Sequence, residues 1–210
     1  MITLYHCKDA RSFRPLWMLE EMQIPYELRI LPFPPRTRAP EYLRINPLGT
    51  IPAFFDGDMG MTESTAICEY LAARYGPTPL GVTAREADFG PYLNWLYFGE
   101  ATLTTPQTVA LQYTRFESQE SRKLPRVAEE QGRIFLARLV AIEAALAASH
   151  EYLCAGRFTA ADISVGYALR LSRYLDLDDA LPGVVKEYWQ RLQAREAYQR
   201  ARAAQSEKAP

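Results

Sequence analysis

The sequence predicts two domains, a small α/β domain followed by an all-helical one, and two observations lead to this fold class. Ten of the 15 prolines lie between Pro15 and Pro79, so the first part of the chain is rich in turns. Short segments with the two-residue period of strands alternate there with helical segments, whereas only helical periods follow the Gly76-Pro77-Thr78-Pro79 stretch. We expect an α/β domain over 1–76, a linker over 77–86, a helical domain over 87–204 and a frayed tail over 205–210.

The first 30 residues have the pattern of a β-α-β unit. Ile2–Tyr5 is a short apolar run typical of a strand. Phe13 and Trp17 follow helical spacing, in a helix that we expect to end near Gln23. Apolar and charged residues alternate over 26–30, as in a half-buried strand. These segments predict two strands joined by a helix.

A hairpin and a second helix complete the predicted α/β domain. Two apolar strands, over 51–55 and 59–61, flank Asp56-Gly57-Asp58, which favours a tight hairpin turn. Apolar residues at helical spacing over 67–71 then mark a helix that stops before Gly76.

Long helical stripes predict the second domain. The stripe from Phe135 to Leu146 recurs at steps of four, three and four residues. Thr159 to Asp162 resembles a capping box with aspartate in the usual Glu or Gln position, so we expect Asp162 to cap a helix and to take no part in catalysis. Pro182 suits the first turn of a further helix.

Composition and charge exclude several classes of function. The 24 Lys and Arg residues balance 25 Asp and Glu residues to a net charge of −1, which argues against a nucleic-acid partner. Apolar runs stay shorter than the roughly 18 residues of a membrane span, and the first residues do not resemble a signal peptide, so we expect a cytoplasmic protein without a membrane partner. Cys7, Cys68 and Cys154 are far apart and odd in number, which suggests reduced thiols. With only His6 and His150 as histidines, we expect no metal.

Two motifs could hold a small peptide. Pro52 opens a predicted strand in which it cannot donate a hydrogen bond, so the Ile51-Pro52 bond should be cis and Ile51 should keep its backbone groups for another peptide-like chain. Ser64 should begin the next helix, where unpaired N–H groups attract a carboxylate, and Glu63 can bind an ammonium group. A plain helix start would also explain Glu63 and Ser64, but their combination with Ile51-Pro52 favours ligand binding.

Four segments together form a specific pattern: 14–21 (RPLWMLEE), 46–53 (NPLGTIPA), 63–67 (ESTAI) and 159–163 (TAADI). With this pattern the sequence resembles the glutathione S-transferase family over nearly its whole length. The resemblance implies a thioredoxin-like first domain that binds glutathione as co-substrate, and a helical domain that supplies most of a second-substrate pocket. It implies a detoxifying enzyme that adds the glutathione thiolate to electrophilic, apolar small molecules. It also implies a homodimer in which the first domain of one subunit faces the helices of the other.

The resemblance also implies which residues hold glutathione. Ile51 would hold the cysteinyl part through its backbone, next to the cis-proline Pro52, and Thr50 would also belong to the glutathione site. Glu63 and Ser64 would hold the γ-glutamyl head. The glycyl carboxylate needs a cation, for which Arg38 is the first candidate and Arg36 and Arg44 are the reserves.

The residue that activates the thiol is left open between several candidates. A thiol with a pKa near 8.5 is only a few per cent ionised at pH 7, so a hydroxyl or a cation must favour the thiolate. Ala10 and Arg11 occupy the positions where serine-type and cysteine-type members keep their key residue. Tyr5 with Arg11 is one candidate pair, and Ser12 is the other hydroxyl. Tyr5 could equally be a half-buried strand aromatic, and Ser12 could be only the N-cap of its helix.

Two other functions remain open. Thiol–disulfide exchange or peroxide reduction would require Cys7, and proteins that resemble this family also serve as non-catalytic interaction modules. In the second domain, Tyr97, Tyr113 and Tyr174 are predicted to line the apolar substrate wall, although helical phase alone cannot select them.

Overall fold

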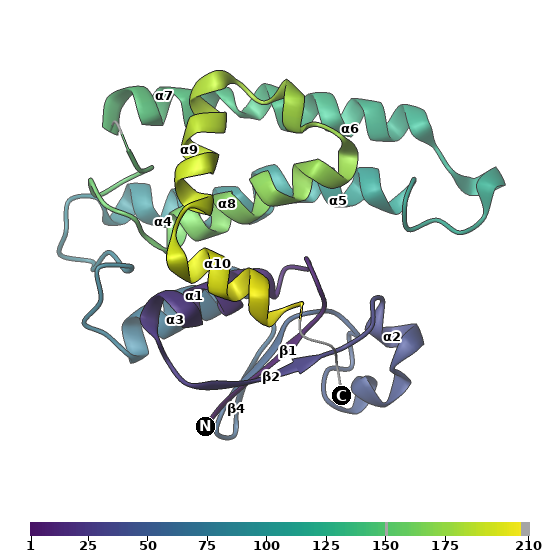
Figure 1. The fold of residues 1–210 in the computed structure, drawn as a ribbon, viewed down its shortest axis with the longest axis horizontal. Coiled ribbons are helices and arrows are strands. Elements are labelled where there is room, and N and C mark those ends of the chain that lie inside the picture. The colour runs from purple at the N-terminus through teal and green to yellow at the C-terminus, as the bar shows by residue number, and fades with distance from the viewer. Residues whose placement is uncertain (150, 207–210) are drawn as a thin grey trace. The chain divides into compact units, whose positions relative to one another are not determined.

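The computed structural model describes residues 1–149 and 151–206, which form two compact units (Figure 1). The first unit combines Met1–Gly81 with the chain from Gln193 onward, and the second is Val82–Leu192. The predicted fold class, a thioredoxin-like α/β part and an all-helical part, is confirmed. The division along the chain differs from the expected one, because the segment after residue 192 belongs to the α/β unit and not to the helical one.

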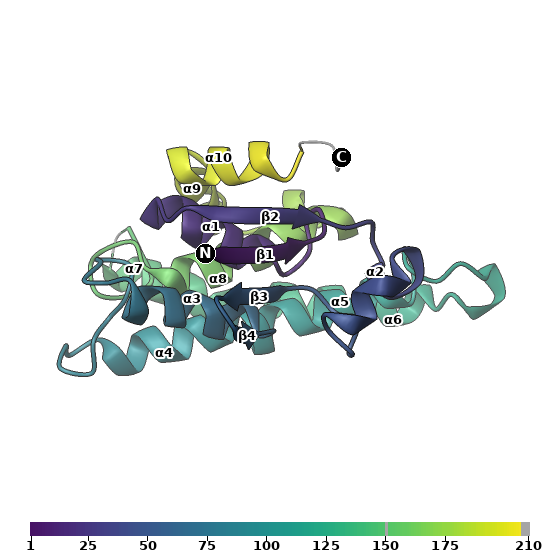
Figure 2. The same ribbon diagram turned by 90° about the horizontal axis from the view of Figure 1, so that it is seen from below.

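The first unit is built on a four-stranded sheet in the order β2-β1-β3-β4 (Figure 2). β1 is parallel to β2 and antiparallel to β3, and Leu4 pairs with Leu28 on one side and with Phe54 on the other. Gly57, at φ +60°, makes the predicted hairpin turn between β3 and β4. The elements of this unit are β1 (Ile2–His6), α1 (Phe13–Met22), β2 (Tyr26–Ile30), α2 (Pro35–Arg38), the 3-10 helix η1 (Pro40–Arg44), β3 (Ala53–Asp56), β4 (Met59–Met61), α3 (Ser64–Arg74) and α10 (Glu196–Ala204).

The two faces of this sheet are covered differently. Successive side chains of a strand point to opposite faces, so Leu4 and His6 share one face and Tyr5 lies on the other. On the Leu4 side, the ring of Phe54 packs against Tyr70 of α3 with the ring centroids 6.0 Å apart. On the opposite side, Tyr5 packs against Tyr42 of η1 at 5.6 Å. The burial of β1 thus alternates between buried and partly exposed residues.

α10 packs against α1, although the sequence analysis predicted no separate helix there (Figures 1 and 2). The fully buried ring of Tyr198 lies edge-on to Trp17, with centroids 4.9 Å apart, and 5.6 Å from the ring of Phe13. Arg195 adds two hydrogen bonds to the carboxylate of Glu21, at 2.6 and 2.8 Å. This aromatic and ionic docking fixes α10 on the α/β unit.

In the second unit, helices are the only regular secondary structure among the described residues. They are α4 (Phe89–Tyr97), the π-helix η2 (Phe98–Thr104), α5 (Thr105–Gln112), the 3-10 helix η3 (Glu120–Arg122), α6 (Pro125–Arg138), α7 (Val140–Ser149), α8 (Ala160–Ser172), the 3-10 helices η4 (Arg173–Leu175) and η5 (Asp178–Ala180), and α9 (Gly183–Gln193). α8 is buried along its whole length, which makes it the core helix of this unit.

The predicted capping box at the start of α8 is confirmed. The Asp162 carboxylate accepts hydrogen bonds from the backbone N–H and the hydroxyl of Thr159, at 2.8 and 3.1 Å. It also accepts from the N–H of Leu153 and from the hydroxyl of Tyr188, at 3.1 and 2.8 Å. Asp162 is therefore a structural residue that ties α9 and the segment before α8 to this core helix.

Candidate functional site

The Ile51-Pro52 bond is cis, as predicted, and the loop before it is held in place by Asn46. The buried Asn46 amide donates to the carbonyl oxygen of Thr50 at 2.8 Å and accepts from the N–H of Leu48 at 3.1 Å. The hydroxyl of Tyr42 also donates to the Thr50 carbonyl, at 2.7 Å. Two donors therefore already bind that oxygen inside the protein. The Thr50 hydroxyl also accepts from the Asn46 amide, at 3.2 Å, so Thr50 keeps its N–H and its hydroxyl hydrogen for a ligand.

Gly49 brings this loop against α2. Its φ of +61° lies in the left-handed region, and a Cβ at this position would lie 2.6 Å from the Cβ of Arg36. Only glycine allows both this φ and this close approach to Arg36. The loop and α2 are therefore closely packed against each other next to Pro52.

Ile51 keeps its backbone groups unpaired, as expected. Within residues 1–149 and 151–206, neither its N–H nor its C=O forms a hydrogen bond. β3 begins only at Ala53, which pairs with Tyr5 at the end of β1. An extended, peptide-like ligand could add to this edge through Ile51.

Ser64 begins α3, as predicted, and Glu63 precedes it as an exposed N-cap residue. The buried Ser64 hydroxyl accepts a hydrogen bond from Nη1 of Arg14 at 3.1 Å. Because a guanidinium group can only donate, the Ser64 hydroxyl hydrogen stays available to a ligand carboxylate. The first-turn N–H groups of Ser64, Thr65 and Ala66 have no intrahelical partner and add further donors.

Arg14 is a site residue that sequence reasoning missed. Its side chain is fully buried in the first turn of α1, near the buried Phe13 and Leu16. Its guanidinium group holds the Ser64 hydroxyl in place through their hydrogen bond. A signal was present in the sequence, since a charged residue on the apolar face of a helix needs a buried partner.

Three arginines could bind the second carboxylate of a peptide ligand. Arg36 and Arg38 lie on α2 and Arg44 ends η1, and all three are exposed. Across the described parts of the chain, none of the three forms an ion pair. The structure thus leaves all three as candidates.

The structure separates the two hydroxyl candidates for thiol activation. Tyr5 lies on the η1 face of the sheet, whereas Ser12 hydrogen-bonds His6, whose side chain points to the opposite face. Ser12 is fully buried, with its Oγ 2.8 Å from Nδ1 of His6. It occupies the N-cap position of α1, but its side chain does not cap the helix. Arg11 is partly exposed one residue before this position.

Cys7 is fully buried between β1 and α1, and its Sγ donates to the carbonyl oxygen of Pro32 at 3.8 Å. Burial raises the pKa of this thiol to about 12. Cys7 is therefore protonated at neutral pH, which argues against a redox role. Cys68 and Cys154 are buried as well, as predicted.

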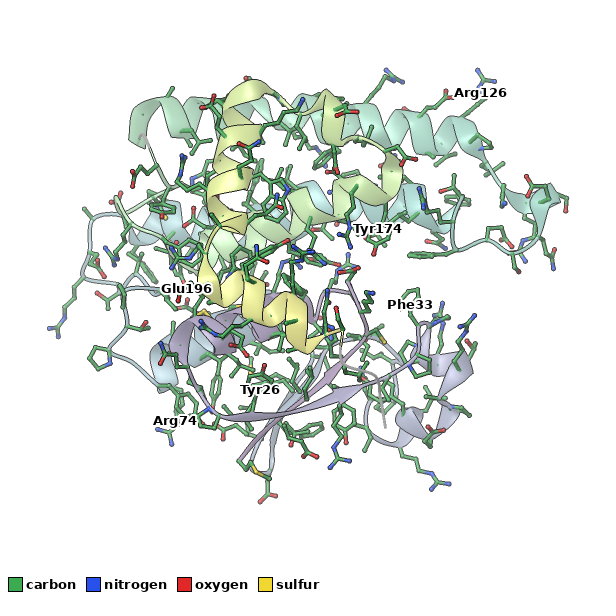
Figure 3. The ribbon with its side chains drawn as sticks, in the orientation of Figure 1. Tyr26, Phe33, Arg74, Arg126, Tyr174 and Glu196 are labelled. Carbon is green, nitrogen blue, oxygen red and sulfur yellow. The ribbon has the colours of Figure 1, made fainter. Side chains whose placement is uncertain are left out.

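Of the three predicted wall tyrosines, two lie at one end of the helical unit. Tyr113 ends α5, and Tyr174 (labelled in Figure 3) lies in η4, which packs against α5. Tyr97 is 54% exposed but ends α4, so that the whole of η2 and α5 separates it from Tyr113. Tyr97 therefore does not join the other two.

Two classes of feature are absent from the residues that the structure describes. No group of three or more His, Cys, Asp or Glu side chains is placed to hold a metal ion. No helix is both long enough and apolar enough to cross a membrane.

Residues 10–74 match the family model described as Glutathione S-transferase, N-terminal domain. Glutathione S-transferase 3 of Schizosaccharomyces pombe is 38% identical over 103 residues, which span 49% of this chain and 43% of that protein. Glutathione S-transferase F10 of Arabidopsis thaliana is 29% identical over 98% of both chains.

Solved structures extend the similarity to the whole chain. The glutathione transferase URE2P6 of Phanerochaete chrysosporium, solved in complex with oxidized glutathione, is 26% identical with a TM-score of 0.82, over 98% of this chain and 97% of that one. The nitrogen regulation fragment of the yeast prion protein Ure2p is 23% identical with a TM-score of 0.82, over 96% of each chain. At that identity the second likeness concerns the fold alone.

Proposed function

The chain belongs to the glutathione S-transferase family, and from this premise we propose that it binds glutathione and adds its thiolate to electrophilic, apolar small molecules. One observation carries the proposal: the unpaired backbone of Ile51 and the donor-rich first turn of α3 border the same end of the sheet. The first group suits a peptide backbone, and the second suits a carboxylate. A tripeptide thiol has both chemical groups.

In this proposal each part of glutathione has its own partners. Ile51, beside Thr50 and the cis-proline Pro52, binds the cysteinyl backbone. Ser64 and the N–H groups after it bind the γ-glutamyl carboxylate, while Glu63 binds the ammonium group. The glycyl carboxylate binds Arg38, with Arg36 and Arg44 as the reserves.

Replacing the Ser64 hydroxyl tests the site directly. A hydrogen bond to a charged group contributes about 1.5–3 kcal/mol, so Ser64→Ala should weaken glutathione binding roughly ten- to hundredfold in calorimetry. Ser64→Thr keeps the hydroxyl and serves as the matched control. Unchanged affinity in Ser64→Ala would show that the site is wrongly assigned.

For the thiol itself we propose Arg11 as the stabilising cation, with Tyr5 and Ser12 as the rival candidates. Arg11 lies at the start of α1, where its charge and the helix N-terminus both favour an anion. Arg11→Ala should raise the thiol pKa of bound glutathione by about one unit, as measured by ultraviolet titration. Tyr5→Phe should change it little, because the Tyr5 ring packs against the rings of Tyr42 and Phe55, and phenylalanine keeps this packing. A large effect of Tyr5→Phe and none of Arg11→Ala would reverse this assignment.

A non-catalytic interaction role is the second candidate, because the fold is shared with the yeast Ure2p fragment. That role would not require a thiol activator. The two functions differ in one simple measurement: retention on glutathione resin together with turnover of a model electrophile supports the enzyme, and retention without turnover of any electrophile supports the interaction protein.

A further inference from the structure

A buried chain of polar groups links Gln205, just after α10, to the loop between β1 and α1. Oε1 of Gln205 lies 3.2 Å from Nε2 of His6, whose Nδ1 lies 2.8 Å from Oγ of Ser12. Gln205 is only 3% exposed, and His6 and Ser12 are fully buried. The sequence predicts a frayed tail that begins at Gln205, whereas the structure places the Gln205 side chain inside the protein.

Asp9 fixes the orientation of the Gln205 amide. The N–H of Asp9 donates to Oε1 at 3.0 Å, and Oδ1 of Asp9 accepts from Nε2 at 2.8 Å. If the amide were flipped, two donors would face each other and two acceptors would face each other. Oε1 is therefore the atom that faces His6, and because it can only accept, Nε2 of His6 carries the hydrogen.

This tautomer determines what the Ser12 hydroxyl can do. In a neutral ring with hydrogen on Nε2, Nδ1 of His6 is an acceptor, so Ser12 donates its single hydroxyl hydrogen to it. The Ser12 oxygen in turn accepts from the N–H of Cys7 at 3.4 Å. The hydroxyl hydrogen of Ser12 is thus already donated to His6 and is not available to a thiolate.

The backbone of the loop depends on the same contact. Asp9 has a φ of +59°, in the left-handed region that non-glycine residues rarely adopt. Gln205 binds both the N–H and the carboxylate of this residue, which holds the loop in its unusual conformation. α10 begins at Glu196 (labelled in Figure 3), and the contacts of Tyr198 and Arg195 hold it against α1. These contacts fix the position of the backbone that carries Gln205.

We propose that Gln205 is a positioning residue of the thiol site, which shapes the loop over residues 7–12 through Asp9 and directs the Ser12 hydroxyl onto His6 and away from the thiol. The inference rests on the proposed function, because the loop leads into Arg11 and the start of α1, where the thiolate is expected. It assigns to α10 a role in catalysis in addition to its packing on α1.

The tautomer can be measured without glutathione. The chain has two histidines, so nitrogen-resolved NMR of a His150→Gln variant reports His6 alone. We expect a neutral ring with hydrogen on Nε2, and loss of this single state in Gln205→Ala. A ring with hydrogen on Nδ1 in the otherwise native chain would overturn the inference even if glutathione binds, so this outcome is independent of the proposed function.

A charge exchange between positions 205 and 9 tests the catalytic part. Gln205→Glu places two carboxylates in contact, and we expect kcat to fall roughly ten- to hundredfold and the thiol pKa of bound glutathione to rise, while KM for glutathione stays within about twofold because Ile51 and Ser64 are untouched. Adding Asp9→Asn restores a donor opposite the new carboxylate, so the double variant should recover most of kcat. Asp9→Asn alone measures the separate effect of that change.

Gln199→Glu is the matched control, because it makes the same change on the exposed part of α10. It should leave kcat and the thiol pKa unchanged. A Gln205→Glu variant that melts at a lower temperature with normal kcat and thiol pKa would show a purely structural role and overturn the inference. Failure of the double variant to recover kcat would overturn it as well.

Discussion

Asp162 is a residue at which burial and hydrogen bonding act in opposite directions on the same carboxyl group. Full burial raises its pKa from 3.8 to about 6, although hydrogen bonds from Thr159, Tyr188 and Leu153 lower it in part. The folded state therefore holds a proton that the unfolded chain releases near pH 4. The resulting stabilisation is complete below about pH 4 and is lost as the pH rises through about 6.

Asp162→Asn makes this contribution measurable. The amide cannot accept at both ends, so at neutral pH we expect a loss of roughly 2–3 kcal/mol in the free energy of unfolding. The difference between the native chain and the variant should then grow by up to about 3 kcal/mol as the pH falls from about 6 to about 4. Urea unfolding at a series of pH values measures this difference in the free energy of unfolding. The contributions of the other titrating groups are the same in the two chains and cancel. A difference that stays constant or shrinks toward pH 4 would contradict the raised pKa.

The cysteines give a second prediction for single residues. Burial raises the pKa of Cys7 and Cys68 to about 12 and that of Cys154 to about 11. At pH 8 roughly one thiol in a thousand or fewer is ionised. We expect no rapid reaction with a disulfide reagent in the folded protein and three equivalents after unfolding. Fast labelling of Cys7 in the native state would restore the redox alternative.

At the level of elements, Gly99 in η2 packs directly on α8. A Cβ at Gly99 would lie 2.3 Å from Oγ of Ser164 and 2.6 Å from its backbone carbonyl carbon. Gly99→Ala must therefore push the two helices apart, and we expect a loss of about 2 kcal/mol or more. Because backbone atoms also block the space, adding Ser164→Ala should not restore stability.

Gly90 in α4 is the matched control for Gly99. It lies in the preceding helix, and nothing lies within 4 Å of its added Cβ. Gly90→Ala should change stability by less than about 1 kcal/mol, because the gain in helix propensity is opposed by the restriction that Pro91 places on the residue before it. Thermal unfolding of both variants measures the two changes in stability. A similar loss of stability in Gly99→Ala and Gly90→Ala would mean that close packing at Gly99 does not explain the loss.

At the level of elements, local patterns predicted what depends on local interactions. The strands, the hairpin turn at Gly57, the start of α3 at Ser64 and the capping box at Asp162 are all encoded within a few neighbouring residues. α2 and η1 were missed because each is only four or five residues long and the segment is rich in proline. α10 was missed because Ala197, Tyr198 and Ala201 form only a narrow apolar stripe.

For the whole molecule, the limit of sequence reasoning is set by contacts between distant segments. The Ile51-Pro52 and Glu63-Ser64 motifs indicated the candidate site because each is contiguous. The hydrogen bonds between Gln205 and Asp9, which hold the loop before α1, join residues 196 positions apart. No local period in the sequence predicts such a pair. The alternation of β1 did contain one unused signal, since it places Tyr5 and His6 on opposite faces of the sheet.

The assembly of the molecule gives the last prediction, a homodimer. Leu48 is 67% exposed. It lies on the loop that Asn46 and Gly49 hold in place, so its large apolar side chain is exposed to solvent on an ordered part of the backbone. Leu43 and Ile45 of the same segment are also exposed, at 39% and 40%, and a group of exposed apolar side chains is typical of an interface. We expect light scattering to give twice the 23.9 kDa chain mass, and Leu48→Glu to give the single-chain mass, because burying a charge without a partner is costly. Leu48→Met keeps the apolar surface and should stay dimeric. A native chain that is monomeric would refute the dimer, and a dimeric Leu48→Glu variant would place the interface elsewhere.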